Sequence, residues 1–374
     1  MNSFEKLRDK SFPSIEECYS QLNKENMTEY DYDRAIEVLK SFDVTNMGEY
    51  HDLYLTTDVL LLADVFENFR TTCIESYKLD PVHYYTLPGF AWDACLLMTG
   101  VQLDVFSNDQ NDMYLMTERG IRGGISVIPH RYSKANNKYM PDYNPHAPSK
   151  YIMYLDANNL YGWAMIQALP TGNYKPAKAK DFTAEKIRNM TNDQPIGYEF
   201  DVDFEYPKEL HDYHNDYPLA AEKIAIQTEE LSFYTKRIMK ILETEHKPCE
   251  KLVPNLKNKK NYVIHYRTLK LYLELGLKLV RINKVVSFAQ TPWLKKYIDF
   301  NTDKRAKSTD DFEKDMYKLM NNAVFGKTME NVRKRICYEL VNKQTRYQKL
   351  VNDTTFKSFI FINDDLVGIS RSKT

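Results

Sequence analysis

The sequence predicts a mixed α/β fold, of the α+β kind, that contains more than one packed unit. The chain has 374 residues, which is more than a single hydrophobic core usually organises. Helical apolar patterns dominate the first hundred residues, and short apolar runs of strand length follow after residue 120. The hydrophobic content of 43% and the charged content of 28% are typical of a globular protein.

Three helices are predicted before residue 100. A short one covers residues 32–42 and a long one covers residues 48–77. Apolar positions such as Leu60 and Phe66 lie on most of the circumference of the long helix, so we expect this helix to be buried. Another apolar helix fits residues 83–99.

Glycine and proline interrupt the middle of the chain. Glycines within residues 120–124 end the helical pattern ahead of a predicted strand at residues 125–128. The prolines of residues 141–149 block regular pairing, which predicts a linker. The apolar run at residues 151–155 then predicts a buried strand that carries Asp156 at its tip.

Regular elements return in the C-terminal third. Residues 170–260 are polar and are expected to be irregular, except for an amphipathic helix near residues 226–245. After them, apolar runs of strand length alternate with segments of helical periodicity. The predicted strands cover residues 262–264, 278–288 and 356–362, and the predicted helices cover residues 266–275, 294–305 and 310–335.

The formal net charge of -1 conceals a strong asymmetry along the chain. Residues 1–70 hold 15 Asp or Glu and 7 Lys or Arg, whereas residues 231–350 hold 27 Lys or Arg and 12 Asp or Glu. A local excess of 15 positive charges is typical of a surface that neutralises phosphates. A solvated helical face explains one basic cluster, but it explains a sustained excess poorly. Nucleic acid is therefore the predicted partner.

The cysteine pattern and the apolar runs exclude several classes of protein. The 5 cysteines are scattered without a C-x-x-C spacing, which argues against a disulfide framework and against a zinc cluster. The longest apolar run, at residues 59–63, is far too short to cross a bilayer. The first residues lack the apolar segment of a secretory signal. We therefore expect a soluble, intracellular protein without a membrane partner.

The strongest chemical signal is the segment Asp-Ala-Asn-Asn-Leu-Tyr-Gly at residues 156–162. A carboxylate at a strand end suits Mg²⁺, which prefers oxygen ligands and substrate phosphates. In two-metal phosphoryl transfer, such a carboxylate places the ions on the attacking and leaving oxygens. The simpler alternative is a strand-end Asp that caps the following helix.

This segment resembles motif A of family B DNA polymerases, D-x-x-S-L-Y-P. Asn159 stands in the Ser position and Gly162 in the Pro position. The resemblance implies that Asp156 is a catalytic metal ligand and that Leu160 contacts the incoming dNTP. It also implies that Tyr161 is the steric gate that excludes a ribose 2′-hydroxyl.

A second signal lies 162 residues further on, in the predicted helix that contains Lys318. Helical spacing places Lys314, Lys318, Asn322 and Phe325 on one face. Two ammonium groups on that face suit a triphosphate, and the aromatic ring suits a nascent base pair. A helix with a solvated lysine ridge is the alternative.

The segment Lys-Leu-Met-Asn-Asn-Ala-Val-Phe-Gly at residues 318–326 resembles motif B, K-x-x-x-N-S-x-Y-G. Ala323 replaces the Ser, and Phe325 replaces the Tyr. The resemblance places this motif on one of two antiparallel fingers helices, with residues 294–305 as its partner. It implies dNTP contacts by the aligned helix face and by Arg305 on the partner helix, and it implies a catalytic role for the motif lysine and a DNA contact at Gly326.

Two weaker signals precede motif A. Tyr54 and Asp58 match the Y-x-x-x-D pattern of the third exonuclease motif, and their spacing puts both on one helix face. The segment Ile-Arg-Gly-Gly at residues 121–124 resembles the Y-x-G-G element between the exonuclease and polymerase domains, where glycine permits close approach to phosphates. Its candidate DNA-contacting residues are Arg122, Gly123 and Gly124. Ile121 stands in the Tyr position.

The ordered motifs together resemble the protein-primed branch of family B DNA polymerases, which includes organellar, viral and mobile-element enzymes. The resemblance implies a DNA-directed DNA polymerase that adds dNTPs to a primer on a DNA template, with Mg²⁺ as cofactor, a terminal protein as candidate primer and an associated 3′-5′ exonuclease. It implies a palm and fingers that follow the C-terminal part of a ribonuclease H-like exonuclease domain. The implied parts are the exonuclease end (1–80), a connection (81–150), the palm (151–290) with an insertion (170–260), the fingers (291–335) and a second palm segment (336–374).

Two parts of the family pattern have no counterpart in this sequence. No first or second exonuclease motif precedes Tyr54, and no D-T-D of motif C follows motif B. Because two-metal catalysis needs carboxylates from both A and C, we expect a chain truncated at both ends that binds nucleic acid but extends primers poorly or not at all. A non-catalytic polymerase remnant that binds nucleic acid is the main alternative. A ribonuclease H-like nuclease is another, but it does not predict motif B.

Overall fold

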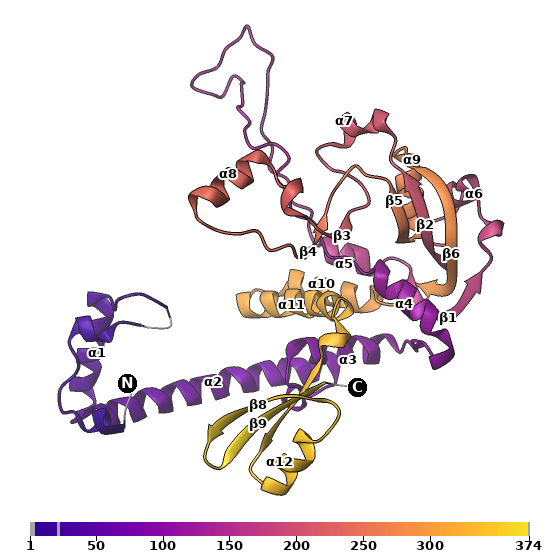
Figure 1. Ribbon diagram of the computed structural model, residues 1–374. Coiled ribbons are helices and arrows are strands. Elements are labelled where there is room, and N and C mark those ends of the chain that lie inside the picture. The colour runs from indigo at the N-terminus through magenta and orange to yellow at the C-terminus, as the bar shows by residue number, and fades with distance from the viewer. Residues whose placement is uncertain (1–3, 21–22, 373–374) are drawn as a thin grey trace. The chain divides into compact units, whose positions relative to one another are not determined.

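The computed structural model describes residues 4–20 and 23–372, and these form two compact units. The first unit covers Met1–Tyr85 and the second covers Thr86–Thr374. Helices and antiparallel sheets occur together (Figure 1), so the predicted mixed fold class is confirmed. None of the helices in the described residues is long and apolar enough to cross a membrane.

The first unit consists of helices. Its elements are the 3-10 helices η1 (Phe4–Arg8), η2 (Ile15–Cys18) and η3 (Pro81–His83) and the helices α1 (Glu29–Ser41) and α2 (Met47–Tyr77). N-cap side chains stabilise the first turn of α1 and of α2: Thr28 accepts a hydrogen bond from the Asp31 amide, and Asn46 accepts one from the Glu49 amide. Both predicted helices are confirmed; α2 matches its predicted range within one residue, whereas α1 begins three residues earlier than predicted.

The predicted burial of α2 is wrong. Its buried residues, Met47, Cys73 and Tyr77, lie in its first and last turns. In between, Leu60 and Leu62 are 60% and 69% exposed. Within this unit, the described 3-10 helices contact the two ends of α2 and leave the middle uncovered. An all-round apolar pattern shows what a helix is able to bury, but not whether a neighbour is there.

The second unit carries ten α-helices among the described residues. They are α3 (Leu87–Thr99), α4 (Asn111–Gly120), α5 (Leu160–Met165), α6 (Ala184–Arg188), α7 (His211–His214), α8 (Phe233–Ile241), α9 (Tyr266–Glu274), α10 (Lys295–Lys307), α11 (Asp311–Thr328) and α12 (Gln344–Val351). The predicted helices at α9 and α10 are confirmed, whereas the helices predicted at residues 226–245 and 310–335 are longer than α8 and α11.

The main sheet of this unit is antiparallel, with strand order β1-β6-β2-β5. Its strands are β1 (Leu169–Ala177), β2 (Ile196–Glu205), β5 (Lys259–His265) and β6 (Lys278–Thr291). One face packs with α6 and α9 around Phe200, Val202 and Leu269. The other face packs with α4 through Met116, which contacts Val263 and Val286. The prediction of an irregular region at residues 170–260 is therefore wrong, since it contains β1, β2 and most of a hydrophobic core.

Polar contacts fix α4 to this sheet. Thr117 donates to Glu199 at 2.7 Å, and Arg119 pairs with the buried Asp201 at 3.0 Å. Burial raises the pKa of Glu199, because the surrounding residues exclude the water that would stabilise its charge. These contacts hold the last turns of the short helix α4, which ends at Gly120, on the sheet.

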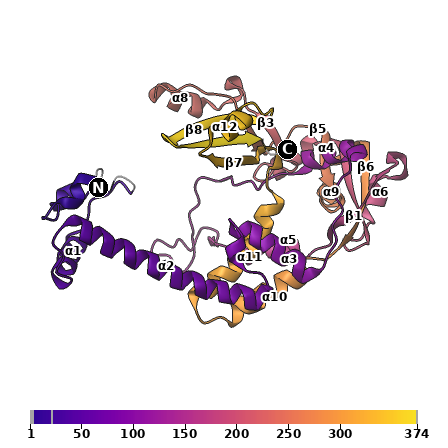
Figure 2. The ribbon, with the colours of Figure 1, turned by 90° about the horizontal axis from the view of Figure 1, so that it is seen from below.

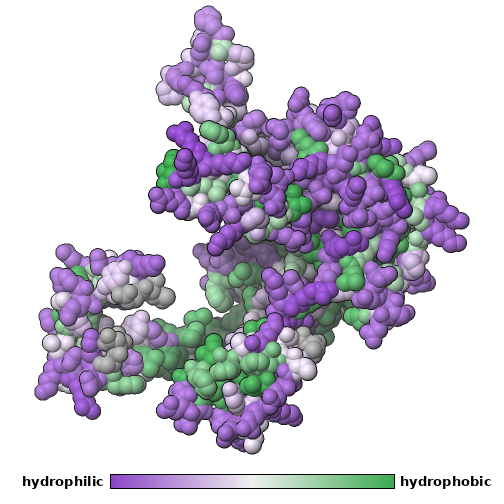
Figure 3. All heavy atoms as spheres, in the orientation of Figure 1, coloured by the Kyte–Doolittle hydropathy of each residue, from purple (hydrophilic) through white to green (hydrophobic). Residues whose placement is uncertain are grey.

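Two smaller sheets complete the second unit. A two-stranded sheet pairs β3 (Glu222–Ala225) with β4 (Glu250–Val253), and a three-stranded sheet has the order β7-β9-β8. Its strands are β7 (Ile336–Val341), β8 (Phe356–Asn363) and β9 (Leu366–Ser372). Val341, Leu350 and Ile369 form a small core between this sheet and α12. Apolar side chains of β8, including Phe361, are exposed, and Figure 3 shows hydrophobic atoms gathered over this sheet.

Two strand predictions are wrong in this unit. Residues 125–128 and 151–155 are coil, and Figure 2 shows the chain between α4 and α5 without a strand arrow. Tyr154 is 94% exposed and Leu155 is 79% exposed. An apolar run forms a strand only where a neighbouring strand accepts its hydrogen bonds, and no strand among the described residues pairs with either segment. The loop between the two segments holds one isolated bridge, Asn136–Lys150.

Candidate functional site

The backbone turns sharply where the segment of motif A enters α5. Asn159 has φ 51° and ψ 43°, a left-handed conformation that asparagine adopts more readily than most residues. A Cβ on the buried Gly162 would lie only 2.3 Å from the Asn159 side-chain nitrogen, so a side chain at position 162 requires that amide to move. The Asn159–Gly162 pair thereby shapes the turn that presents Tyr161.

Tyr161 meets the aromatic residue of motif B. Its ring stacks on Phe325 with the centroids 4.1 Å apart and the planes 6° from parallel. The two rings come from α5 and α11, which pack against each other, and Tyr161 stays 49% exposed. The structure therefore brings together two segments that lie far apart in the sequence, at the two aromatic residues that sequence reasoning selected.

A buried polar pair fixes α11 against α10. Asn301 donates from its side chain to Asn321 at 2.8 Å, and Tyr297 donates to the Met320 carbonyl at 3.2 Å. Both asparagines are buried, at 0% and 5% exposure. Sequence reasoning missed these residues. The available signal was an asparagine in each helix at a position of helical spacing from apolar residues; Asn321, for example, lies four residues after Tyr317 and three before Val324, both of which are buried.

The cations of α10 and α11 differ in how they are held. Lys314 pairs with Asp311 at 2.9 Å, one turn before it on the same helix. Lys318 and Arg305, which lies near the end of α10, are both exposed. Neither forms a hydrogen bond or an ion pair with its side chain among the described residues. Lys318 and Arg305 are therefore available to an anion, whereas Lys314 would have to leave its carboxylate.

Three further predicted site residues lie close in sequence to the stacked rings: Leu160 beside Tyr161, and Asn322 and Gly326 on either side of Phe325. Asn322 is half-buried one turn before Phe325, and Leu160 is 54% exposed at the start of α5. Gly326 is exposed, and a Cβ there would meet no atom within 4 Å. The open space beside Gly326 leaves room for a ligand backbone, although the fold itself does not require a glycine.

Asp156 lies in exposed coil three residues before Asn159. It has no hydrogen bond or ion pair with another described residue, so it does not cap α5. Among the described residues, no group of three or more His, Cys, Asp or Glu side chains is arranged to hold a metal ion. The donor set therefore fits Mg²⁺ only if Asp156 is joined by phosphate oxygens of a substrate, as is usual for this ion.

In the segment Arg122–Gly124, the arginine is held by contacts within the protein, whereas the two glycines have open space beside them. Arg122 donates to the Val263 carbonyl at 2.7 Å, and its guanidinium lies 3.9 Å above the Tyr262 ring. These contacts fix the arginine to β5. Gly123 and Gly124 are exposed, and a Cβ on either would meet nothing within 4 Å. Of the three, only the glycines leave their surroundings open.

The candidate exonuclease residues lie in the first unit. Tyr54 and Asp58 are both on α2, where Tyr54 is 61% exposed and Asp58 is exposed as well. Within this unit, Asp52 is the nearest acidic neighbour in sequence, and it contacts His51 at 3.3 Å. The described residues therefore place the pair on one open helix face without assembling other carboxylates around it.

The chain belongs to the DNA polymerases of type B. The family model that matches is that of the organellar and viral DNA polymerases of this type, and it covers residues 10–372. Comparison with curated proteins gives no match.

Solved structures of Phi29 DNA polymerase are similar to this chain. The complex with primer-template DNA has a TM-score of 0.40 and 16% identity, covering 70% of this chain and 38% of the other. The orthorhombic crystal form has a TM-score of 0.42 and 14% identity, covering 87% and 45%. The ternary complex with primer-template DNA and incoming nucleotides has a TM-score of 0.42 and 15% identity, with the same coverage. The chain thus spans less than half of the length of these polymerase chains.

Proposed function

We propose that the chain acts in DNA synthesis as part of a protein-primed DNA-directed DNA polymerase, in which it binds primer–template DNA and the incoming dNTP. The observation that carries this proposal is the Tyr161–Phe325 stack, because it joins the two sequence motifs at one place. The family match supports the polymerase assignment. The excess of 15 positive charges in residues 231–350 supports DNA as the partner.

The stacked rings would form the floor under the sugar of the dNTP. Face-to-face stacking at 4.1 Å would favour this position of the Tyr161 ring by about 0.5–1.5 kcal/mol before a nucleotide arrives. A ribose 2′-hydroxyl would then press against the ring, whereas a deoxyribose would not. Tyr161 would thus discriminate by exclusion, and Phe325 would hold it in place.

The basic residues would hold the triphosphate. Lys318 is exposed and without a carboxylate partner among the described residues, and Asn322 follows it by one turn on the same helix. Arg305 adds a second unpaired cation from α10. Charge-assisted hydrogen bonds from such groups to phosphate oxygens are roughly twice as strong as neutral ones.

Asp156 is the residue that would hold Mg²⁺, together with the phosphates of the bound nucleotide. When bound, the ion would polarise the phosphoryl oxygens that react. Asp156 itself contributes an exposed carboxylate beside the start of α5. Gly123, Gly124 and Gly326 would let the DNA backbone approach the protein closely.

The region inserted between the palm motif and the fingers would lie within residues 170–260, and a priming protein would dock there. This region holds β2 and nearly all of β1, and Phe200 and Val202 of β2 belong to the core of the sheet. Tyr54 and Asp58 would belong to a 3′-5′ exonuclease centre whose other carboxylates come from outside the described residues.

A non-catalytic function is the second candidate. Asp156 is the one carboxylate residue in the two motif segments, residues 156–162 and 318–326, and two-metal transfer needs more than one carboxylate. In that case the chain would bind primer–template DNA and nucleotide without extending the primer.

Two assays separate these outcomes. In the first, anisotropy of a labelled primer–template is measured with Mg²⁺ and with the next correct dNTP; we expect the dNTP to tighten binding about 10-fold and Lys318→Ala to remove that gain. The matched control is Lys40→Ala, an exposed lysine outside the basic region. If the correct dNTP tightens binding no more than a mismatched one, the proposed site is wrong.

The second assay is primer extension on the same substrate. Extension that falls at least about 100-fold in Asp156→Ala supports catalysis by this chain. Binding that depends on dNTP, without any extension, supports the non-catalytic candidate.

A further inference from the structure

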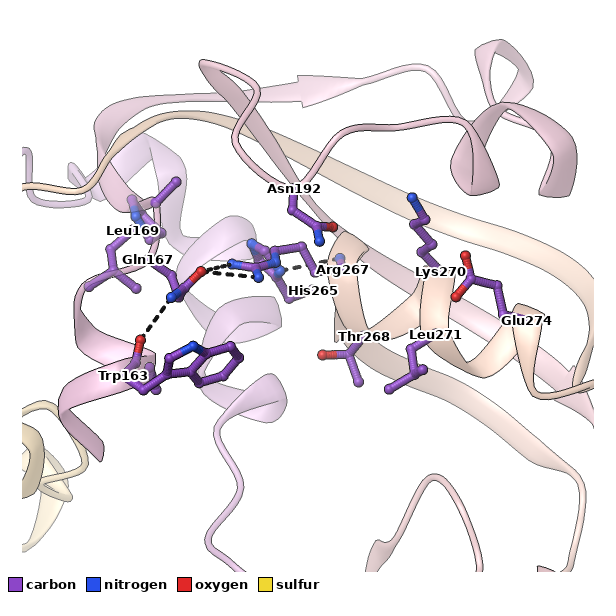
Figure 4. A pocket seen from close by; sticks show the side chains of 13 residues that line it. Trp163, Gln167, Leu169, Asn192, His265, Arg267, Thr268, Lys270, Leu271 and Glu274 are labelled. Atoms are coloured by element: carbon purple, nitrogen blue, oxygen red, sulfur yellow. Dashed lines mark hydrogen bonds between the residues drawn. The ribbon is translucent and has the colours of Figure 1, made fainter. Parts of the chain in front are cut away.

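A pocket of about 570 Å³ opens between α5, the start of β1 and α9 (Figure 4). It is separate from the motif A and motif B rings. Tyr161 and Trp163 are two residues apart on α5, so their side chains leave the helix about 200° apart. Tyr161 faces Phe325, and Trp163 lines the pocket on the other side.

The pocket has an aromatic wall that solvent reaches. Trp163 is 56% exposed although it lines a concave surface. Its indole lies across the pocket from Thr268 and Leu271 of α9 (Figure 4). An accessible indole face inside a pocket is suited to stacking on a planar ring, and every nucleobase offers such a ring.

Two cations of α9 line the same pocket. Arg267 donates to the Gln167 side-chain oxygen from both terminal nitrogens, at 3.3 Å each, and Lys270 donates to the Met190 carbonyl at 3.0 Å. Neither forms an ion pair within the described part of the chain. Glu274 is the only carboxylate of the described lining residues. The charged lining residues therefore carry a net positive charge, which suits a phosphate.

The pocket is open on one side. Trp163, Asn192, Thr268 and Leu271 are all exposed residues of its rim. A pocket for a free small molecule usually covers 70–90% of its ligand. An open pocket instead suits one unit of a polymer, because the chain of the polymer has to enter and leave.

We propose that this pocket binds an unpaired nucleotide of single-stranded DNA, with the base stacked on Trp163 and a phosphate held by Arg267 and Lys270. The proposal rests on the proposed function, since it adds a strand-holding site to a DNA-binding chain. The side-chain nitrogen of Gln167 donates to the Trp163 carbonyl at 2.9 Å and keeps a second N–H. That N–H and the hydroxyl of Thr268 would supply hydrogen bonds at the edge of the base without selecting one base. α9 lies within the basic region, residues 231–350.

The test uses the full chain and a labelled oligothymidylate. Trp163→Leu is expected to weaken binding about 5- to 150-fold, and Trp163→Phe, which keeps a stacking ring, is expected to stay within about 3-fold of the unchanged chain. Arg267→Gln is expected to lower the slope of log affinity against log salt by about 1. The matched control is Tyr213→Leu, an aromatic residue that is 81% exposed outside the pocket.

A second measurement locates the base directly. An oligonucleotide with 5-iodouracil at an unpaired position is irradiated on the chain, and the peptide that carries Trp163 is expected to be the crosslinked one. Equal binding by Trp163→Leu and the unchanged chain, or crosslinks only at other peptides, would overturn the proposal. Deoxythymidine monophosphate that competes as tightly as the oligonucleotide would also overturn it, since the strand would then add nothing.

The two proposals fail in different ways. If the unchanged chain binds neither primer–template nor single-stranded DNA, the proposed function is wrong. If it binds both and Trp163→Leu has no effect, only the pocket assignment is wrong.

Discussion

His265 is the residue at which β5 ends and α9 begins. Its ring lies 4.6 Å from that of Tyr266 and 5.9 Å from that of Phe288, and its side chain accepts from the Arg267 amide at 3.4 Å. Burial lowers the pKa of His265 to about 4, with a smaller contribution from the nearby positive charge of Arg267. The ring is therefore neutral near pH 7, where it caps α9 as an acceptor.

This shift predicts how stability depends on pH. The folded pKa of His265 lies below its ordinary value of 6.5, so the unfolded chain takes up the proton first as the pH falls. The contribution is complete above about pH 6.5 and is lost as the pH falls towards 4, by at most about 3 kcal/mol. Urea unfolding at pH 7 and pH 4.5 measures it, with His265→Asn expected to reduce the difference while it keeps a capping oxygen.

Another histidine provides the control for this measurement. His146→Asn changes an exposed ring and is expected to leave the pH dependence as it is in the unchanged chain. If His265→Asn and His146→Asn behave alike, burial of the His265 ring does not contribute to the pH dependence.

At the scale of elements, the asparagine pair between α10 and α11 fixes one helix against the other. Asn301→Leu would leave the buried Asn321 oxygen without its donor, which costs about 1–3 kcal/mol in the free energy of unfolding. The double change to leucine at both positions removes both polar groups and is expected to restore much of that loss. Urea unfolding of the two single variants and the double variant measures the coupling; strictly additive losses would contradict it.

Local patterns predict elements well where the pattern and the packing agree. The helices α2, α9 and α10 and the strands β5 and β6 lie close to the predicted ranges, because helical periodicity and apolar runs determine them. In β2, Phe200, Val202 and Phe204 alternate with polar residues, and this period-two signal was present in a region predicted to be irregular. β1 was hidden by Pro170 and Pro176, which an edge strand tolerates.

The remaining errors come from information that no local pattern holds. The run at residues 151–155 is apolar, but whether it becomes a strand depends on a partner elsewhere. At the candidate site, sequence order selected Tyr161 and Phe325, and only the packing of α5 on α11 shows that they touch. The pocket beside Trp163 combines residues about a hundred positions apart, so sequence spacing could not reveal it.

At the scale of the whole molecule, charge is divided unevenly along the chain, and this predicts how DNA binding responds to salt. Residues 231–350 carry an excess of 15 positive charges, whereas residues 1–70 carry an excess of 8 negative ones. If about five phosphates are neutralised, log affinity falls with log salt with a slope of about −4 to −5. Between 50 and 200 mM salt the affinity of the full chain for primer–template should then fall about 500-fold.

A local change in charge tests where this slope originates. Lys304, Arg305 and Lys307 are exposed in the last turn of α10, and their joint replacement by Gln is expected to make the slope less steep by about 2. Lys40→Gln, an exposed change in the acidic region, should leave the slope unaltered because phosphates are repelled from its surroundings. Anisotropy of one labelled duplex at several salt concentrations measures all of these slopes. Equal slopes for the two variants would mean that α10 makes no phosphate contacts.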